Sequence, residues 1–185
     1  MKIIEIREAR DRHLEAQEYQ DALNYSELLL SEHKFEIDFD DWFKKGLCHF
    51  NLDQDEQAVE SYTNALTIEP YNFQAMTNKA ISLLRLDNEK EAFVLLKKAL
   101  GINPHIAPAW FNIGFYHIAN YGEKAGAYEK AVNAFRRAVR DYPEFADAKI
   151  YLPFHESYGT IGYLLRFAHS VQECKDDQIL KLEDD

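Results

Sequence analysis

Residues 42–49 read WFKKGLCH, and this stretch recurs along the chain at a fixed interval. A shift of 34 residues gives MTNKAISL at 76–83, and a second shift of 34 gives WFNIGFYH at 110–117. Each stretch is followed by spaced small and large residues and a proline: Ala58, Tyr62, Ala65, Pro70; Ala92, Leu96, Ala99, Pro104; Ala131, Phe135, Ala138, Pro143. A period of this length is typical of a stacked repeat array.

The period divides the chain into repeats that each read as two antiparallel helices. Residues 39–72, 73–106 and 107–145 are clear repeats, and residues 3–36 are a degenerate first one. In that first repeat, Ala22, Ser26 and Leu29 take the places of Ala58, Tyr62 and Ala65. Residues 146–185 lose the period and are predicted to form capping helices with an acidic tail, because the exposed end of an array needs a cover. We interpret residues 1–185 as one domain.

Several local features refine this interpretation. The small residues Gly46, Ala80 and Gly114 should let the two helices of a repeat approach closely. Asp53 and Asp87 fall in the turns between helices, where each could cap the second helix. The run of Asp38, Asp40 and Asp41 indicates a solvated helix start, since acids favour helix N-termini. Five extra residues within 119–128 predict a longer turn, either tolerated variation or a binding element.

Composition excludes several classes of partner. The formal net charge of −11 argues against nucleic acid, which requires a basic surface. No apolar run approaches the roughly 20 residues of a membrane span, and the charged first residues do not suit a signal peptide. Two distant cysteines favour a reducing compartment. We therefore expect a cytoplasmic protein that makes no contact with a membrane.

The pattern resembles the tetratricopeptide repeat (TPR) family over about residues 3–145. It departs from the family at Met76, where tryptophan is usual, and at His49 and His117, where tyrosine is usual. The resemblance implies an all-α fold, a right-handed antiparallel helix-pair solenoid of about four units, with a C-terminal capping helix after them. It also implies a concave groove, lined by the first helices, that binds peptides or helices of partner proteins.

The same resemblance places candidate site residues around the Trp42–Gly46 segment and its equivalents. The predicted partner-binding residues are Phe43, Lys44, Leu47, Phe50, Asn78, Ile81, Arg85, Phe111, Asn112 and Phe115. The apolar members would form an exposed patch of the kind that marks a binding site, unless helices bury them. The asparagines could clamp a peptide backbone or be passively solvated, since an amide both donates and accepts. The positions of a carboxylate clamp lack basic pairs, which disfavours binding of acidic chaperone tails.

Nothing in the sequence indicates catalysis. It shows no phosphate-binding glycine loop, no nucleophile elbow and no zinc-spaced histidine–carboxylate motif, so we expect no enzyme, no metal and no cofactor. The leading hypothesis is a non-catalytic adaptor or scaffold that binds a hydrophobic or amphipathic segment of a partner protein. The alternatives are a small secretion-type chaperone for one client and a homo-oligomerising structural module, such as a homodimer.

Overall fold

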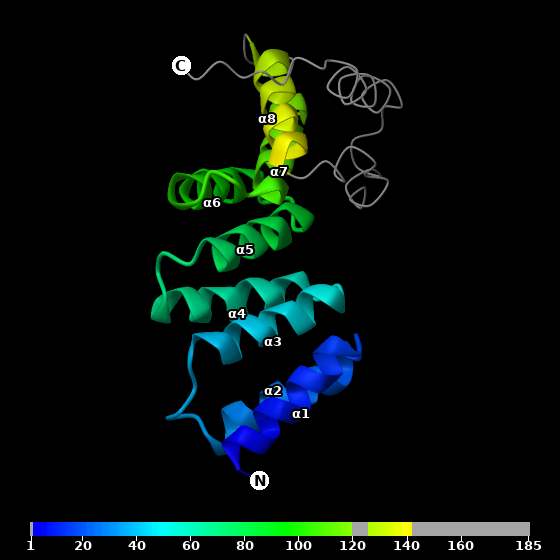
Figure 1. Cartoon of the computed structure of the whole chain (residues 1–185), viewed down its shortest axis with the longest axis vertical. Helices are drawn as coiled ribbons and strands as arrows, with labels where there is room; N and C mark the ends of the chain where they lie inside the picture. The colour runs from blue at the N-terminus through cyan, green and yellow to red at the C-terminus, as the bar shows by residue number, and fades with distance from the viewer. Residues whose placement is uncertain (1, 120–125, 142–185) are drawn as a thin grey trace. The chain divides into compact units, whose positions relative to one another are not determined.

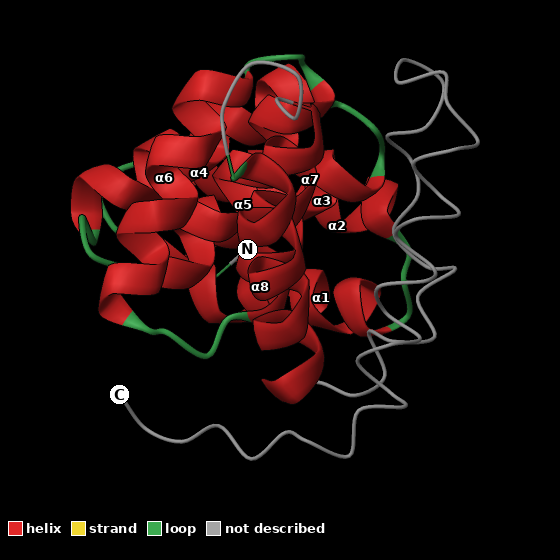
Figure 2. Ribbon diagram, turned by 90° about the horizontal axis from the view of Figure 1, so that it is seen from above, coloured by secondary structure: helices red, strands yellow, loops and turns green. Residues whose placement is uncertain are grey.

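The computed structural model of this chain describes residues 2–119 and 126–141. Throughout these residues the regular elements are α-helices (Figure 2). They belong to two compact units, Met1–Ala99 and Leu100–Asp185. The capping helices predicted for residues 146–185 lie outside the described residues, as do residues 120–125 of the predicted long turn.

The helices come in pairs, one pair for each repeat predicted from the period. Their bounds are α1 Ile3–Glu15, α2 Tyr19–Glu32, α3 Phe39–Asn51, α4 Asp55–Ile68, α5 Phe73–Arg85, α6 Glu89–Ile102, α7 Ala107–Ala119 and α8 Ala127–Asp141. In the first unit, α1–α2 and α3–α4 follow one another along the chain (Figure 1). The predicted all-α helix-pair solenoid is therefore confirmed. None of the described helices has the length and apolar character needed to cross a membrane.

A glycine and a large ring meet where the two helices of a pair cross. A Cβ atom at Gly46 of α3 would lie 2.5 Å from Cε1 of Tyr62, a fully buried ring on α4. In the second unit, a Cβ atom at Gly114 of α7 would collide in the same way with the ring of Phe135 on α8. The prediction that these glycines allow close approach of the helices is confirmed.

The first repeat reverses these sizes. Arg10 stands 36 residues before Gly46, Ser26 stands 36 residues before Tyr62, and both are buried. Ser26 thus matches the position of Tyr62 but not its volume. Close by, Cys48 packs against Ala22 and Leu23, and burial raises the pKa of its thiol to about 11, against the opposing effects of Arg10 and Ser26.

The first helices α1, α3 and α5 end in a shared turn. Gln17, Asp53 and Asp87 have positive φ angles of 59°, 55° and 57°, the left-handed region. The next N–H group then returns to a carbonyl five residues earlier, for example from Gln54 to His49 at 2.9 Å. The prediction that Asp53 and Asp87 cap the second helices is wrong. They close the first helices instead, because aspartate tolerates the left-handed conformation better than most residues do.

Candidate protein-binding face

The predicted site residues of the first unit lie on α3 and α5. Those on each helix are spaced three or four residues apart, which places them on one side of it. Six of them are half-buried and define what we call the α3–α5 face: Phe43, Leu47, Phe50, Asn78, Ile81 and Arg85. The first helices of two successive repeats therefore carry side chains that the core covers only in part.

Phe43 and Asn78 border the same buried ring. The ring centroid of Phe43 lies 5.8 Å from that of Tyr62 and 5.4 Å from that of Phe39, on which it stacks. Burial raises the pKa of Tyr62, and the amide of Asn78 beside the hydroxyl opposes that rise. Two predicted site residues from consecutive repeats are thus brought together around Tyr62.

Arg85 is held by groups of the preceding repeat. Its guanidinium carbon lies 4.0 Å from the ring centroid of Phe50, a cation–π distance. Its Nη1 donates to the carbonyl of Phe50 at 3.3 Å and to Asp53 at 3.2 Å. Asp55 lies 3.7 Å from the same nitrogen; burial raises the pKa of this carboxyl, and the charge of Arg85 opposes the rise. Arg85 and Phe50 therefore join α5 to the end of α3.

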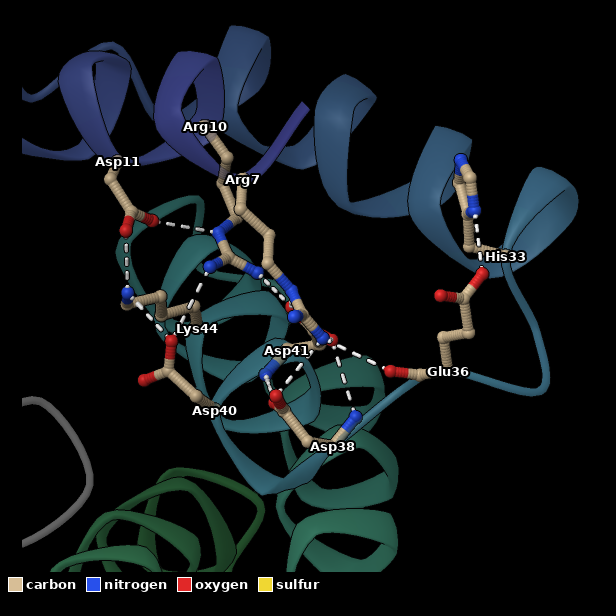
Figure 3. A network of polar contacts seen from close by, with 9 residues as sticks. All are labelled: Arg7, Arg10, Asp11, His33, Glu36, Asp38, Asp40, Asp41 and Lys44. Carbon is tan, nitrogen blue, oxygen red and sulfur yellow. Dashed lines mark hydrogen bonds and ion pairs between the residues drawn. The ribbon is translucent and has the colours of Figure 1, made fainter. Parts of the chain in front are cut away.

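Lys44 belongs to an ion-pair network between α1 and α3 (Figure 3). Its Nζ lies 2.7 Å from a carboxylate oxygen of Asp11 and 2.7 Å from one of Asp40. The centre of the network is Asp41, which accepts from Nε of Arg7 at 3.0 Å and from Nη1 of Arg10 at 2.6 Å. The predicted partner-binding role of Lys44 thus competes with two ion pairs inside the chain.

The central pair of this network is removed from water. Arg10 is 0% exposed and Asp41 is 3% exposed. Burial alone would raise the pKa of Asp41, but hydrogen bonds from Arg7 and Arg10 outweigh it and hold that pKa below its usual value. Removing one partner of such a pair is costly, because the other charge stays buried without compensation.

The network explains what the sequence interpretation missed at Asp41. Asp38 is an N-cap as predicted, since its side chain accepts from the Asp41 N–H at 3.1 Å. Asp41, however, is a buried partner of two arginines and not part of a solvated run. One signal for this was present in the sequence: Arg7 and Asp41 are 34 residues apart, one repeat period.

The predicted site residues of the second unit are engaged within that unit. Phe111 is 4% exposed, and its ring lies 4.9 Å from Phe115 and 5.7 Å from Phe135. Phe115 is half-buried against the same cluster. Asn112 donates from Nδ2 to the carbonyl of Pro108 at 2.8 Å, within its own helix. Phe111 is therefore a core residue, because Phe135 and its neighbours on α8 cover it.

A histidine–carboxylate group occurs at the first inter-helix turn. His13, Glu18 and Asp21 bring one potential ligand atom each within 4.8 Å of one another. The Nδ1 atom of His13 lies 2.6 Å from Glu18, and in the next repeat the Nδ1 atom of His49 lies 2.7 Å from Gln54. The contact recurs where the partner is an uncharged amide, so the turn accounts for it without a metal ion.

Two segments of the chain match family models described as tetratricopeptide repeat, at residues 42–72 and 109–144. FlbA of Caulobacter vibrioides is 30% identical over 103 residues, which is 56% of this chain and only 16% of that relative. MamA of Desulfovibrio magneticus RS-1, solved from its residue 41 to its end, has a TM-score of 0.69 at 21% identity and 94% and 91% coverage of the two chains. YrrB, described as a TPR protein with an unusual peptide-binding site, has a TM-score of 0.64 at 18% identity and 75% and 68% coverage.

The two structural likenesses concern the fold, and the sequence matches fall on the second and fourth helix pairs. Both agree with the 34-residue period and with the glycine-to-ring contact that recurs in those two pairs. This chain is therefore a tetratricopeptide repeat protein.

Proposed function

We propose that this protein is a scaffold that holds an apolar or amphipathic segment of a partner protein on the α3–α5 face. The supporting observation is that Phe43, Leu47 and Ile81 remain half-buried, while Gly46, Ala80 and other residues at the helix crossings are buried. Apolar side chains that a fold leaves partly in water, together on one face, are typical of a binding surface. The peptide-binding site in the description of YrrB, which has the same fold, supports this proposal.

The residues of this face would divide the work. Phe43, Leu47 and Ile81 would supply apolar contact, and Asn78 could donate to and accept from the backbone of a bound segment. Lys44, Phe50 and Arg85 would position the helices, because the network and the cation–π contact already occupy them. The proposed protein is non-catalytic and cytoplasmic. A chaperone for a single client would use the same face, since it too binds apolar stretches.

A test compares two surface substitutions in the full chain. Phe43→Glu with Ile81→Glu places charge on the proposed face, and Val94→Glu is the control, because Val94 is a 52% exposed apolar residue on α6. Peptides selected from a displayed random library on the unmodified protein should be apolar or amphipathic. We expect their affinity for the double variant to fall at least tenfold, about 1.4 kcal/mol, and to be unchanged for the control. Circular dichroism checks that both variants fold.

The proposal fails if the selected peptides bind the double variant as tightly as the unmodified chain. It also fails if the Val94→Glu control weakens binding by the same factor, because the effect would then not belong to this face.

A further inference from the structure

Charge changes sign along the described part of the chain. Residues 1–72 carry 7 Lys and Arg against 17 Asp and Glu, a formal charge of −10. Residues 73–141 carry 10 against 6, a formal charge of +4. An acidic chain with net charge −11 therefore contains one region that is basic.

The second helices of the repeats show this change most clearly. Neither α2 nor α4 contains a lysine or arginine, and each contains three acidic residues. In contrast, α8 contains four basic residues against two acidic ones. We define the acidic face as the exposed residues Asp21, Glu27, Glu56 and Glu60, and the basic face as the exposed residues Lys130, Arg136, Arg137 and Arg140.

The fold leaves the acidic face available. Glu27, Glu56 and Glu60 form no hydrogen bond or ion pair with the part of the chain that the structure describes. Glu56 and Glu60 are four residues apart on α4, so like charges lie side by side on one helix, which is unfavourable without a counter-charge. A basic surface placed against them would remove that repulsion.

The basic face is built by the packing of the second unit. On α8, Ala131, Ala134, Phe135 and Ala138 are buried against α7, so the opposite side of the helix carries the cations into solvent. Arg137 is held in place by the ring of Trp110, with 4.5 Å between its guanidinium carbon and the ring centroid. Its orientation is thus partly fixed before any partner arrives.

We propose that the acidic face of one copy of this chain docks on the basic face of a second copy. Complementary charge within the one sequence is what selects a second copy as the occupant. The net charge of −11 does not prevent this, because at physiological ionic strength the screening length is about 8 Å and only the facing groups interact strongly. The two faces differ, so each copy keeps one free face and the contact can continue from copy to copy. This surface is separate from the α3–α5 face, and the two proposals fail independently.

Charge reversal with complementation tests the docking. One variant, Lys130→Glu with Arg136→Glu and Arg140→Glu, reverses the basic face and keeps Arg137 on Trp110. The other, Glu27→Lys with Glu56→Lys and Glu60→Lys, reverses the acidic face. Analytical ultracentrifugation of the full chain should show self-association of the unmodified protein that weakens about tenfold or more between roughly 0.1 and 0.5 M NaCl. Each variant alone should be monomeric, and an equimolar mixture of the two should associate again.

A matched control separates facing charge from net charge. Lys34→Glu with Lys90→Glu and Lys98→Glu changes net charge as much as the α8 variant does, at exposed sites away from the basic face. This control should keep most of the association. The proposal is overturned if the unmodified chain is monomeric at all concentrations in about 0.1 M NaCl, even if α8 then binds a poly-glutamate peptide. It is equally overturned if the mixed variants stay monomeric or if the control loses as much association as the α8 variant.

Discussion

Gly46 and Tyr62 show at the residue scale how one hydrogen atom sets the distance between two helices. The ring of Tyr62 occupies the volume that any larger residue at position 46 would need. Glycine normally weakens a helix, by roughly 0.5–1 kcal/mol relative to alanine. Here that cost is offset by the close packing of α3 on a fully buried ring.

This packing predicts opposite effects for two glycine-to-alanine changes. Gly46→Ala should lower the free energy of unfolding by about 1–3 kcal/mol, because the new methyl group overpacks a rigid contact. Gly101→Ala on α6 should raise it by up to about 1 kcal/mol, because a Cβ atom there meets nothing within 4 Å. Urea denaturation measures both. Equal effects of the two substitutions would contradict the role given to Tyr62.

At the scale of the element, each helix pair depends on the turn that reverses the chain. Gln17 of the first repeat adopts the same left-handed conformation as Asp53 and Asp87 of the next two. The three turns share backbone hydrogen bonds, but their side chains differ in how well they tolerate a positive φ. Gln17 is the least suited of the three.

We therefore predict that Gln17→Gly stabilises the protein by about 0.5–1 kcal/mol, because glycine adopts positive φ without steric cost. Gln17→Ala is the control, since alanine keeps the steric cost and changes only the polar side chain. Thermal unfolding should rank the glycine variant above both others. A glycine variant no more stable than the alanine variant would contradict the argument.

Sequence spacing predicts elements better than it predicts partners. Helix pairs follow from the period, because the positions that pack a pair recur every 34 residues. The burial of Asp41 does not follow from local spacing, because its partners Arg7 and Arg10 stand in another repeat. The burial of Phe111 was missed for a related reason: it depends on the neighbouring ring of Phe135, and a position alone does not say how far a neighbour covers it.

At the scale of the whole molecule, the α1–α3 network joins the atypical first repeat to the second. The pKa of Asp41 lies below its ordinary value of about 3.9, and so does that of Asp11, where Lys44 and Arg10 outweigh the effect of burial. A carboxyl group whose pKa is lower in the folded chain stabilises the fold above its unfolded pKa. That contribution is lost as pH falls through the folded pKa, so it should disappear below about pH 4.

Asp41→Asn should accordingly lower the free energy of unfolding by roughly 3–5 kcal/mol at neutral pH, because Arg10 would stay buried without its counter-charge. The loss of stability on going from about pH 5 to pH 2 should be smaller in this variant than in the unmodified chain. Asp38→Asn is the control, since asparagine also caps a helix well and Asp38 is exposed. Urea titrations across that pH range provide the measurement, and equal losses in both variants would count against the network.

The buried Arg10 also decides which repeats are interchangeable. It fits where Ser26 leaves room on α2 and where the next repeat supplies Asp41. One period after Asp41 the chain has Ala75, and one period later Ala109. A copy of the first repeat inserted further along would therefore meet alanine where its arginine needs an acid. The first repeat is a specific end piece, and an array of this kind can be lengthened only by copying the units behind it.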